Sequence, residues 1–158
     1  MYGILTNQRL WGCTPFVYHV SYYVYVHPMR YSYLSETLLD NMTMEKIMTQ
    51  DGITTKHYHT NNDRFSDSGF FDDINEKDQK LTICGVGVHH QNGITEKKNK
   101  HLTTGTITLL LRSTRMWPQT IDEIFWPFAI NAVAKSLNSL KIDLKVRTPE
   151  SIFHSIKV

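Results

Sequence analysis

The stretch that decides the fold is residues 89–98, HHQNGITEKK, where a loop enters a helix that we predict over residues 94–115. A second stretch, residues 57–65, HYHTNNDRF, stands at the end of a predicted short strand. Apart from these two segments, the pattern is that of a generic α/β domain. Inferences about function therefore start from these two segments.

The chain before residue 89 alternates strands and helices. Residues 16–29 are dense in Val and Tyr, which favours two antiparallel strands joined by a turn near Ser21. Ser35 is a good N-cap for a helix that stops near Gly52. Apolar residues of that helix are Leu38, Met42, Ile47 and Met48. The expected order continues with a strand at residues 54–59, a short helix at 70–79 and a strand at 81–88.

The C-terminal part, about residues 94–155, is predicted to be helical. Gly105 and its threonine neighbours are poor helix formers within the first of these helices. Residues 120–123, TIDE, form a capping-box pattern, and Pro127 is expected to kink the following helix one turn in. Residues 148–150, TPE, predict the start of another helix. We expect an α/β fold with a mixed sheet, in a single domain over residues 1–158.

Composition sets the broad class. A chain of 158 residues can bury one core, and 41% hydrophobic with 20% charged residues is typical of soluble globular proteins. We see no membrane-spanning run and no signal segment, so no membrane partner is expected. Lysine plus arginine exceed the acids by only 17 to 15, too little to indicate nucleic-acid binding alone. Cys13 and Cys84 are expected as reduced core residues of an intracellular protein.

Residues 57–65 and 89–98 together resemble the integrase core of copia-type retrotransposons, a member of the ribonuclease H-like superfamily. In that family a strand ends in Asp-Asn-Gly, and a later Gln-Asn-Gly leads into the helix that bears the third catalytic acid. Asn61 and Glu96 occupy the second and third acidic slots, 96 − 61 = 35 positions apart, which fits the family. The resemblance covers about residues 11–155. Further matches are RMWP at 115–118, FWP at 125–127 and the closing TPESI at 148–152.

The resemblance implies a ribonuclease H-like mixed sheet flanked by helices, with its first strand missing. That strand carries the first catalytic Asp and lies upstream of the segment that matches residues 10–12. Tyr18 stands where relatives usually carry an Asp. We therefore expect a truncated and degenerate core.

The family joins DNA with two divalent cations, Mg²⁺ or Mn²⁺, that three carboxylates hold. Glu96 is the retained acid, and the resemblance implies that it is a metal ligand. The alternative is an exposed helix residue that pairs with Lys100. Asn61 is neutral and offers one carbonyl oxygen, and Asp63 fits a turn better than a ligand position. We expect weak or no metal binding and an impaired catalytic site.

Five residues around the start of the expected helix are candidates for nucleic-acid binding: Gln91, Asn92, Lys97, Lys98 and Lys100. In relatives this helix lies along the DNA, and lysines beside an active site contact phosphates without reading sequence. An ordinary solvated face is the equally simple alternative.

Histidines and tyrosines allow further interpretations. His57 with His59, and His89 with His90, permit a zinc site, although solvated histidines are the simpler interpretation. The tyrosines between residues 18 and 33 permit base stacking, although strand propensity explains them more simply.

Two functions from different classes follow. The first is a retrotransposon integrase core-like protein, related to DNA integration and nucleic-acid binding, with impaired catalysis and DNA as its partner. The second is a domesticated scaffold for nucleic-acid binding or dimerisation, without catalysis and as a homo-oligomer. A third interpretation is one fragment of a longer polyprotein.

Overall fold

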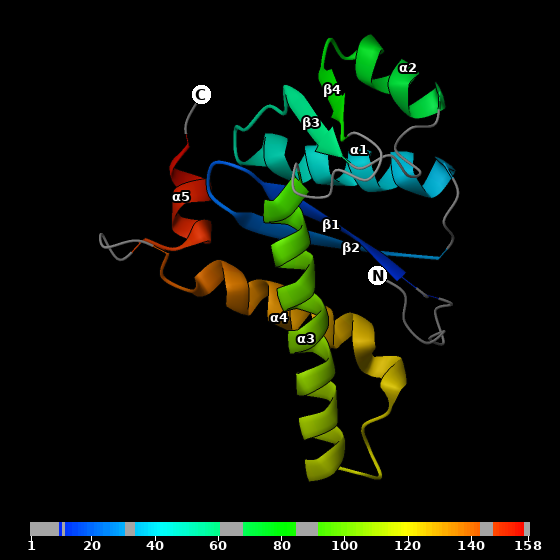
Figure 1. Cartoon of the computed structure of the whole chain (residues 1–158), viewed down its shortest axis with the longest axis vertical. Helices are drawn as coiled ribbons and strands as arrows, with labels where there is room; N and C mark the ends of the chain where they lie inside the picture. The colour runs from blue at the N-terminus through cyan, green and yellow to red at the C-terminus, as the bar shows by residue number, and fades with distance from the viewer. Residues whose placement is uncertain are drawn as a thin grey trace. The chain divides into compact units, whose positions relative to one another are not determined.

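The computed structural model divides the chain into two compact units (Figure 1). The hairpin unit comprises Met1–Tyr31 and Ile94–Ser155, and the α1 unit comprises Ser32–Gly93 and Ile156–Val158. The structure describes residues 10, 12–30, 34–60, 68–84, 92–142 and 147–156. No helix in these ranges combines the length and the apolar character that crossing a membrane requires.

The order of elements is the predicted one, a mixed α/β arrangement with small sheets. The hairpin unit contains β1 (Gly12–Tyr18), β2 (Tyr23–Met29), α3 (Gly93–Met116, from Ile94 onward), the 3₁₀ helix η3 (Glu123–Phe125), α4 (Trp126–Ser139) and α5 (Pro149–Ser155). The α1 unit contains α1 (Leu34–Gln50), β3 (His57–Thr60), α2 (Ser68–Glu76) and β4 (Lys80–Ile83).

β1 and β2 form an antiparallel hairpin whose register runs from Gly12 opposite Met29 to Tyr18 opposite Tyr23. Alternate residues of β2 enter the core, because successive side chains of a strand point to opposite faces. Val24 and Val26 are accordingly buried. The turn lies where Ser21 predicted it, and the Tyr22 backbone N–H donates to the Tyr18 carbonyl at 2.8 Å.

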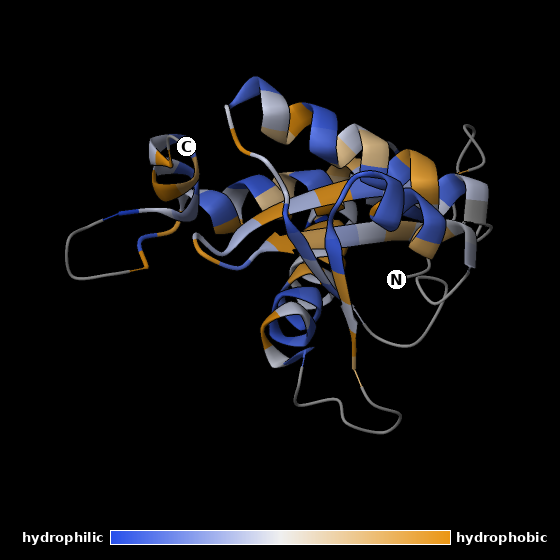
Figure 2. Ribbon diagram, turned by 90° about the horizontal axis from the view of Figure 1, so that it is seen from above, coloured by the Kyte–Doolittle hydropathy of each residue, from blue (hydrophilic) through white to orange (hydrophobic). Residues whose placement is uncertain are grey.

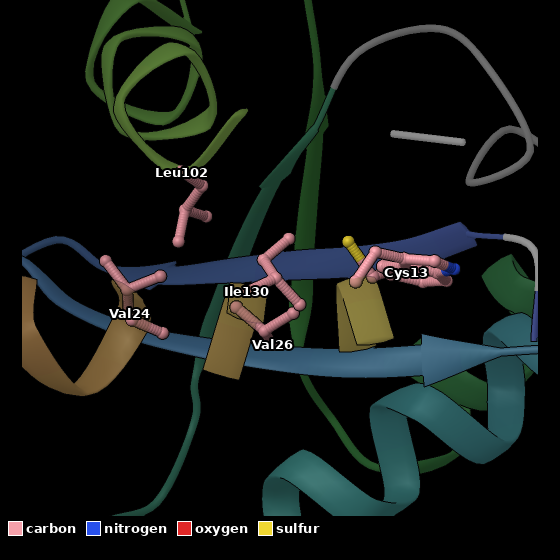
Figure 3. Close-up of a cluster of buried hydrophobic side chains, with 7 residues drawn as sticks. Cys13, Val24, Val26, Leu102 and Ile130 are labelled. Carbon is pink, nitrogen blue, oxygen red and sulfur yellow. The ribbon is translucent and has the colours of Figure 1, made fainter. Parts of the chain in front are cut away.

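The core of the hairpin unit joins both strands to α3 and α4 (Figure 3). Its buried members are Cys13, Val24, Val26, Leu102, Trp126, Ile130 and Ala134. Viewed nearly along its axis, α3 carries both hydrophilic and hydrophobic stretches around its circumference (Figure 2). Leu102 faces the core, whereas Leu109 is 37% exposed, so the leucines of α3 are buried only in part.

Asn138 ties α4 to the backbone of β2. Its Oδ1 accepts from the Val24 N–H at 2.8 Å, and its Nδ2 donates to the Val24 carbonyl at 2.9 Å. The side chain is 5% exposed, so these bonds form away from water. An amide at this position satisfies the backbone groups that a neighbouring strand would otherwise pair.

α5 packs on the turn end of the hairpin through one aromatic residue. Phe153 is 1% exposed, stacks on Tyr23 with ring centroids 4.3 Å apart, and meets Tyr18 edge-on at 5.5 Å. Thr148 caps the helix as predicted, because its Oγ1 accepts from the Ser151 N–H at 3.1 Å. Pro149 follows at the first helical position.

In the α1 unit, β3 and β4 pair in parallel from His57 opposite Lys80 to Thr60 opposite Ile83. α2 connects the two strands, as parallel pairing requires a crossover. Phe70 and Ile74 form the buried face of α2.

Three predictions about helix starts are wrong: the kink at Pro127, the capping box at residues 120–123 and the N-cap at Ser35. Pro127 does not kink a helix one turn in, because α4 begins at Trp126 and the proline lies in its first turn, where a missing N–H is harmless. The preceding cap is Asp122, whose side chain accepts from the Glu123 N–H, and it starts a 3₁₀ turn. Ser35 lies inside α1, which begins at Leu34.

The buried face of α1 also differs from the prediction. Met42 is 57% exposed, while Thr37, Asp40 and Asn41 are buried with Met44. Polar residues therefore occupy core positions that a hydrophobic pattern assigns to apolar ones. Gly52 does end the helix as predicted, with a φ of 76° that glycine adopts readily.

The pairing senses of a mixed sheet are both present, but in separate sheets. Among the described residues, β1–β2 is one two-stranded antiparallel sheet and β3–β4 is one two-stranded parallel sheet. The ribonuclease H-like arrangement of one continuous sheet therefore stays a prediction.

Candidate functional site

The candidate site begins at the N-terminal end of α3. Glu96, the acid that the sequence singled out, lies in the first helical turn and is exposed. Lys97 and Lys100 follow as exposed residues, and His101 lies beside them on the same face. The structure thus brings together an acid and a cationic row on one exposed helix.

Lys98 lies on a different side of α3 and is less exposed than its neighbours. Its ammonium group lies 6.0 Å from the centroid of the ring of Tyr22, a residue of the turn between β1 and β2. Burial lowers the pKa of Lys98, and the charge of Lys97 lowers it further. Two adjacent lysines of the hairpin unit therefore hold their charges close together.

The electrostatics of this helix end favour an anion. Backbone N–H groups and the helix dipole put partial positive charge at an N-terminus, so Glu96 is favourably placed there. Lys97 and Lys98 oppose the dipole, at a cost of about 0.3–1 kcal/mol each when exposed. The two lysine charges add to the partial positive charge of the helix end. The resulting positive potential favours a bound phosphate group.

A divalent metal does not find its ligands among the described residues. Mg²⁺ prefers several oxygen ligands in octahedral geometry, and carboxylates are its usual protein donors. Glu96 supplies one carboxylate. No group of three His, Cys, Asp or Glu side chains that could hold an ion occurs in the part of the chain that the structure describes. The described donors therefore do not fit the metal centre of an integrase, and we derive no step through one.

The histidine pair of β3 lies on one face of the parallel sheet, where His57 meets Thr82 of β4 and His59 meets Cys84, the residue that directly follows β4. His57 Nε2 lies 2.6 Å from Thr82 Oγ1, and His59 Nε2 lies 3.3 Å from Cys84 Sγ. The pair thus serves cross-strand hydrogen bonding, with the buried Cys84 as one partner. Cys13 is buried as well, and both are free thiols as predicted.

Several predicted residues lie outside the described ranges. These are Asn61, Asp63, His89, His90 and Gln91. Asn92 is described, directly precedes α3 and is partly buried. The assignment of Asn61 to the second acidic slot therefore stays a prediction.

A second polar cluster belongs to the α1 unit. Glu45 on α1 accepts from the Tyr58 hydroxyl at 2.8 Å, from Gln79 Nε2 and from Lys77 Nζ at 3.0 Å. Burial raises the pKa of Tyr58, and the Glu45 carboxylate raises it further. Burial alone lowers the pKa of Lys77, but hydrogen bonds and charges of Asp73 and Glu45 outweigh burial and raise it. These hydrogen bonds connect α1 to β3 and to the α2–β4 connection, although Gln79 Oε1 is buried without a hydrogen-bond partner among the described residues.

Comparison with known proteins places the fold. No protein-family profile and no curated protein matches the sequence. Solved structures do match. The HTLV-2 integrase catalytic core in complex with magnesium, in its trimeric form, has a TM-score of 0.65 at 19% identity, over 96% of this chain and 99% of the other.

The chain is similar in fold to retroviral integrase catalytic cores. A chain of the simian T-cell lymphotropic virus intasome, solved in complex with the PP2A regulatory subunit B56 gamma, matches with a TM-score of 0.69 at 16% identity. The match covers 100% of this chain and 60% of the other. The BIV integrase catalytic core has a TM-score of 0.61 at 13% identity, over 92% of this chain and 93% of the other. Identities this low show similarity of fold alone, which agrees with the expected likeness to an integrase core; the copia type and the degeneracy of the core stay predictions.

One residue of the site was missed by sequence reasoning. Tyr22 was assigned to strand propensity together with its neighbours, but it lies in the turn with a φ of 59°. The signal was present, since a tight hairpin turn without Gly or Asn forces some other residue into the left-handed region. The sequence did not tell which of residues 19–22 takes that conformation.

Proposed function

We propose that this chain is a copia-type integrase-core domain that binds DNA along the N-terminal half of α3 and no longer joins DNA strands. The observation that carries the proposal is the exposed cationic row of Lys97 and Lys100, in a fold like that of integrase cores. Its partner is the sugar–phosphate backbone of DNA, which lysines contact without reading sequence.

The positions of the lysines support binding over a merely solvated face. Surface lysines that serve solubility suit the C-terminal end of a helix, where they interact favourably with the dipole. Here Lys97, Lys98 and Lys100 fall in the first two turns of a helix of 24 residues. Gln91 and Asn92, next to the same helix start, would add neutral hydrogen-bonding groups to the phosphate-binding surface.

Catalysis needs more than this surface offers. Two metal ions held by carboxylates must activate the nucleophile and stabilise the leaving oxygen. Asn61 replaces a carboxylate by a neutral amide in the second acidic slot, and Glu96 contributes one negative charge. We therefore assign binding to this chain and expect no strand transfer.

A salt titration of DNA affinity tests the binding part. We would measure affinity for a short duplex by fluorescence anisotropy, for the unmodified chain and for Lys97→Gln/Lys100→Gln. The slope of log K against log salt is negative, and each lost phosphate contact reduces its magnitude by about 0.9. The magnitude for the double variant is therefore expected to fall by about 2.

The matched control is Lys46→Gln/Lys135→Gln, which removes the same charge from exposed positions on α1 and α4. It is expected to leave the slope nearly unchanged. If both double variants show the same reduction in salt slope, the reduction is due to net charge alone. That result would contradict a DNA interface on α3.

Calorimetric titration with Mg²⁺ and Mn²⁺ tests the catalytic part. We expect no binding isotherm for the unmodified chain, and a gain of metal binding, if any, only in Asn61→Asp. The proposal of lost catalysis fails if the unmodified chain binds metal and Glu96→Ala abolishes that binding, or if the purified chain joins DNA strands.

A second candidate function is self-association as a scaffold. The distal half of α3 exposes Ile107 at 53% and Leu111 at 68%, one turn apart on the same side of the helix. HTLV-2 integrase cores are known in dimeric and trimeric forms. Sedimentation of the chain beside Leu111→Lys tests this function: a concentration-dependent oligomer that the substitution abolishes supports it, and a monomer at all concentrations rejects it.

A further inference from the structure

The turn between β1 and β2 carries an unusual residue for its backbone. Tyr22 has a φ of 59°, in the left-handed region that glycine and asparagine adopt readily and bulky residues rarely do. Gly or Asn would relieve the turn. A tyrosine at this position therefore weakens the hairpin and calls for a compensating role of its side chain.

Burial does not supply that role. Tyr22 is 39% exposed and Val20 is 66% exposed, so these two residues of the turn reach solvent, although Ser21 between them is buried. By contrast, Tyr18 and Tyr23 at the ends of the strands pack on Phe153. The aromatic contacts that hold the hairpin to α5 thus do not involve Tyr22 among the described rings.

The neighbour of the Tyr22 ring is the ammonium group of Lys98, 6.0 Å from the ring centroid. An aromatic face at this distance attracts a cation and restricts the conformations of the long lysine side chain. The lysine is thereby held near the N-terminal end of α3, next to Lys97. A cation ordered in advance binds an anion more tightly than one that must be ordered on binding.

We propose that Tyr22 and Lys98 form a phosphate-contacting element on the hairpin turn, which extends the DNA interface from α3 to the β1–β2 hairpin. Lys98 contacts the DNA backbone, and Tyr22 is a positioning residue that acts through Lys98. The inference rests on the proposed DNA binding, because both elements take the same ligand. It adds that the turn of the β1–β2 hairpin takes part in DNA binding.

Opposite effects on stability and affinity distinguish this role from a structural one. Tyr22→Asn relieves the turn and raises the melting midpoint by about 2–4 °C, the shift that a small stabilisation gives a chain of this size. The same substitution lowers affinity for a short DNA duplex about two- to five-fold, because the lysine loses its ring. Tyr22→Phe keeps the ring and restores affinity relative to Tyr22→Asn.

Lys98→Gln supplies the second measurement, since it alters a surface lysine and does not depend on the turn. It lowers the salt slope by about 0.9, as one lost phosphate contact should. Tyr22→Asn combined with Lys98→Gln loses no more affinity than Lys98→Gln alone. Val20→Asn, a change at another exposed residue of the same turn, leaves affinity unchanged.

Three results overturn the inference. Affinity unchanged in Tyr22→Asn removes the positioning role, and an unchanged salt slope in Lys98→Gln removes the contact. In both cases the α3 interface stands if Lys97→Gln/Lys100→Gln still lowers the slope. Absence of DNA binding by the unmodified chain ends both the inference and the proposed function.

Discussion

At Gly105, α3 and α4 approach so closely that we predict a larger residue to strain the contact. A Cβ built on Gly105 would lie 2.8 Å from Val133 Cγ1 and 3.3 Å from Val133 Cγ2. Real Cβ atoms essentially never approach another heavy atom within 3.0 Å. Valine cannot easily swing its methyl groups away, because branching at Cβ leaves a helical valine one strongly preferred rotamer.

Two opposing free energies decide the result of Gly105→Ala. Alanine is the better helix former by about 1 kcal/mol, which stabilises the folded state. Overpacking against Val133 costs about 1–3 kcal/mol. We therefore expect Gly105→Ala to lower the free energy of unfolding by up to about 2 kcal/mol. In a Val133→Ala background the two Cγ atoms are gone, and the same substitution should stabilise by about 1 kcal/mol.

A double-mutant cycle measured by urea unfolding and circular dichroism tests this sign reversal. The coupling between the two positions is expected to be about 1–3 kcal/mol. Gly93→Ala is the control in the same helix, because nothing lies within 4 Å of its added Cβ. If Gly105→Ala stabilises the chain equally in both backgrounds, the two helices do not approach as closely as we describe.

Three further substitutions test other contacts. Asn138→Ala leaves the Val24 N–H and carbonyl buried without partners and should cost about 2–4 kcal/mol in urea unfolding; a loss below about 0.5 kcal/mol contradicts the tie. Phe153→Ala should cost about 3–5 kcal/mol, and a smaller loss would mean that α5 docks weakly on the hairpin. The pKa of Tyr58 is raised by burial and by Glu45, so stability is full below about pH 10 and falls as pH rises above it. From about pH 9 to 11 the unmodified chain should lose about 1.4 kcal/mol more than Tyr58→Phe, and parallel pH profiles would reject the shift.

Local signals in the sequence predicted the order of elements because each signal acts within a few residues. Gly52 stops α1 through its own φ, and Thr148 caps α5 through a hydrogen bond to Ser151. Strand propensity likewise placed the hairpin around Ser21. The fold similarity to integrase cores followed from short motifs, without any match over the whole sequence.

Features that depend on packing between distant residues escaped the prediction. Gly105 looked like an interruption of α3, and only its contact with Val133 on α4 gives it a role. Met42 was expected among the apolar residues of α1, but it is exposed, and Asp40 and Asn41 are buried there together with Met44 and Met48. Which side of a helix is buried depends on what covers it, and no helical period contains that information.

The two halves of integrase function differ in how they tolerate substitution. A metal centre needs several carboxylates around the same ions, so one neutral amide such as Asn61 removes most of its affinity. Phosphate contacts add nearly independently, and each lysine contributes its own share of the salt dependence. Glu96 therefore contributes little to catalysis without the other carboxylates. Each of Lys97, Lys98 and Lys100, in contrast, can contribute to phosphate binding by itself. A chain that drifts from the catalytic pattern should lose strand transfer first and DNA binding last, which is the state that we propose here.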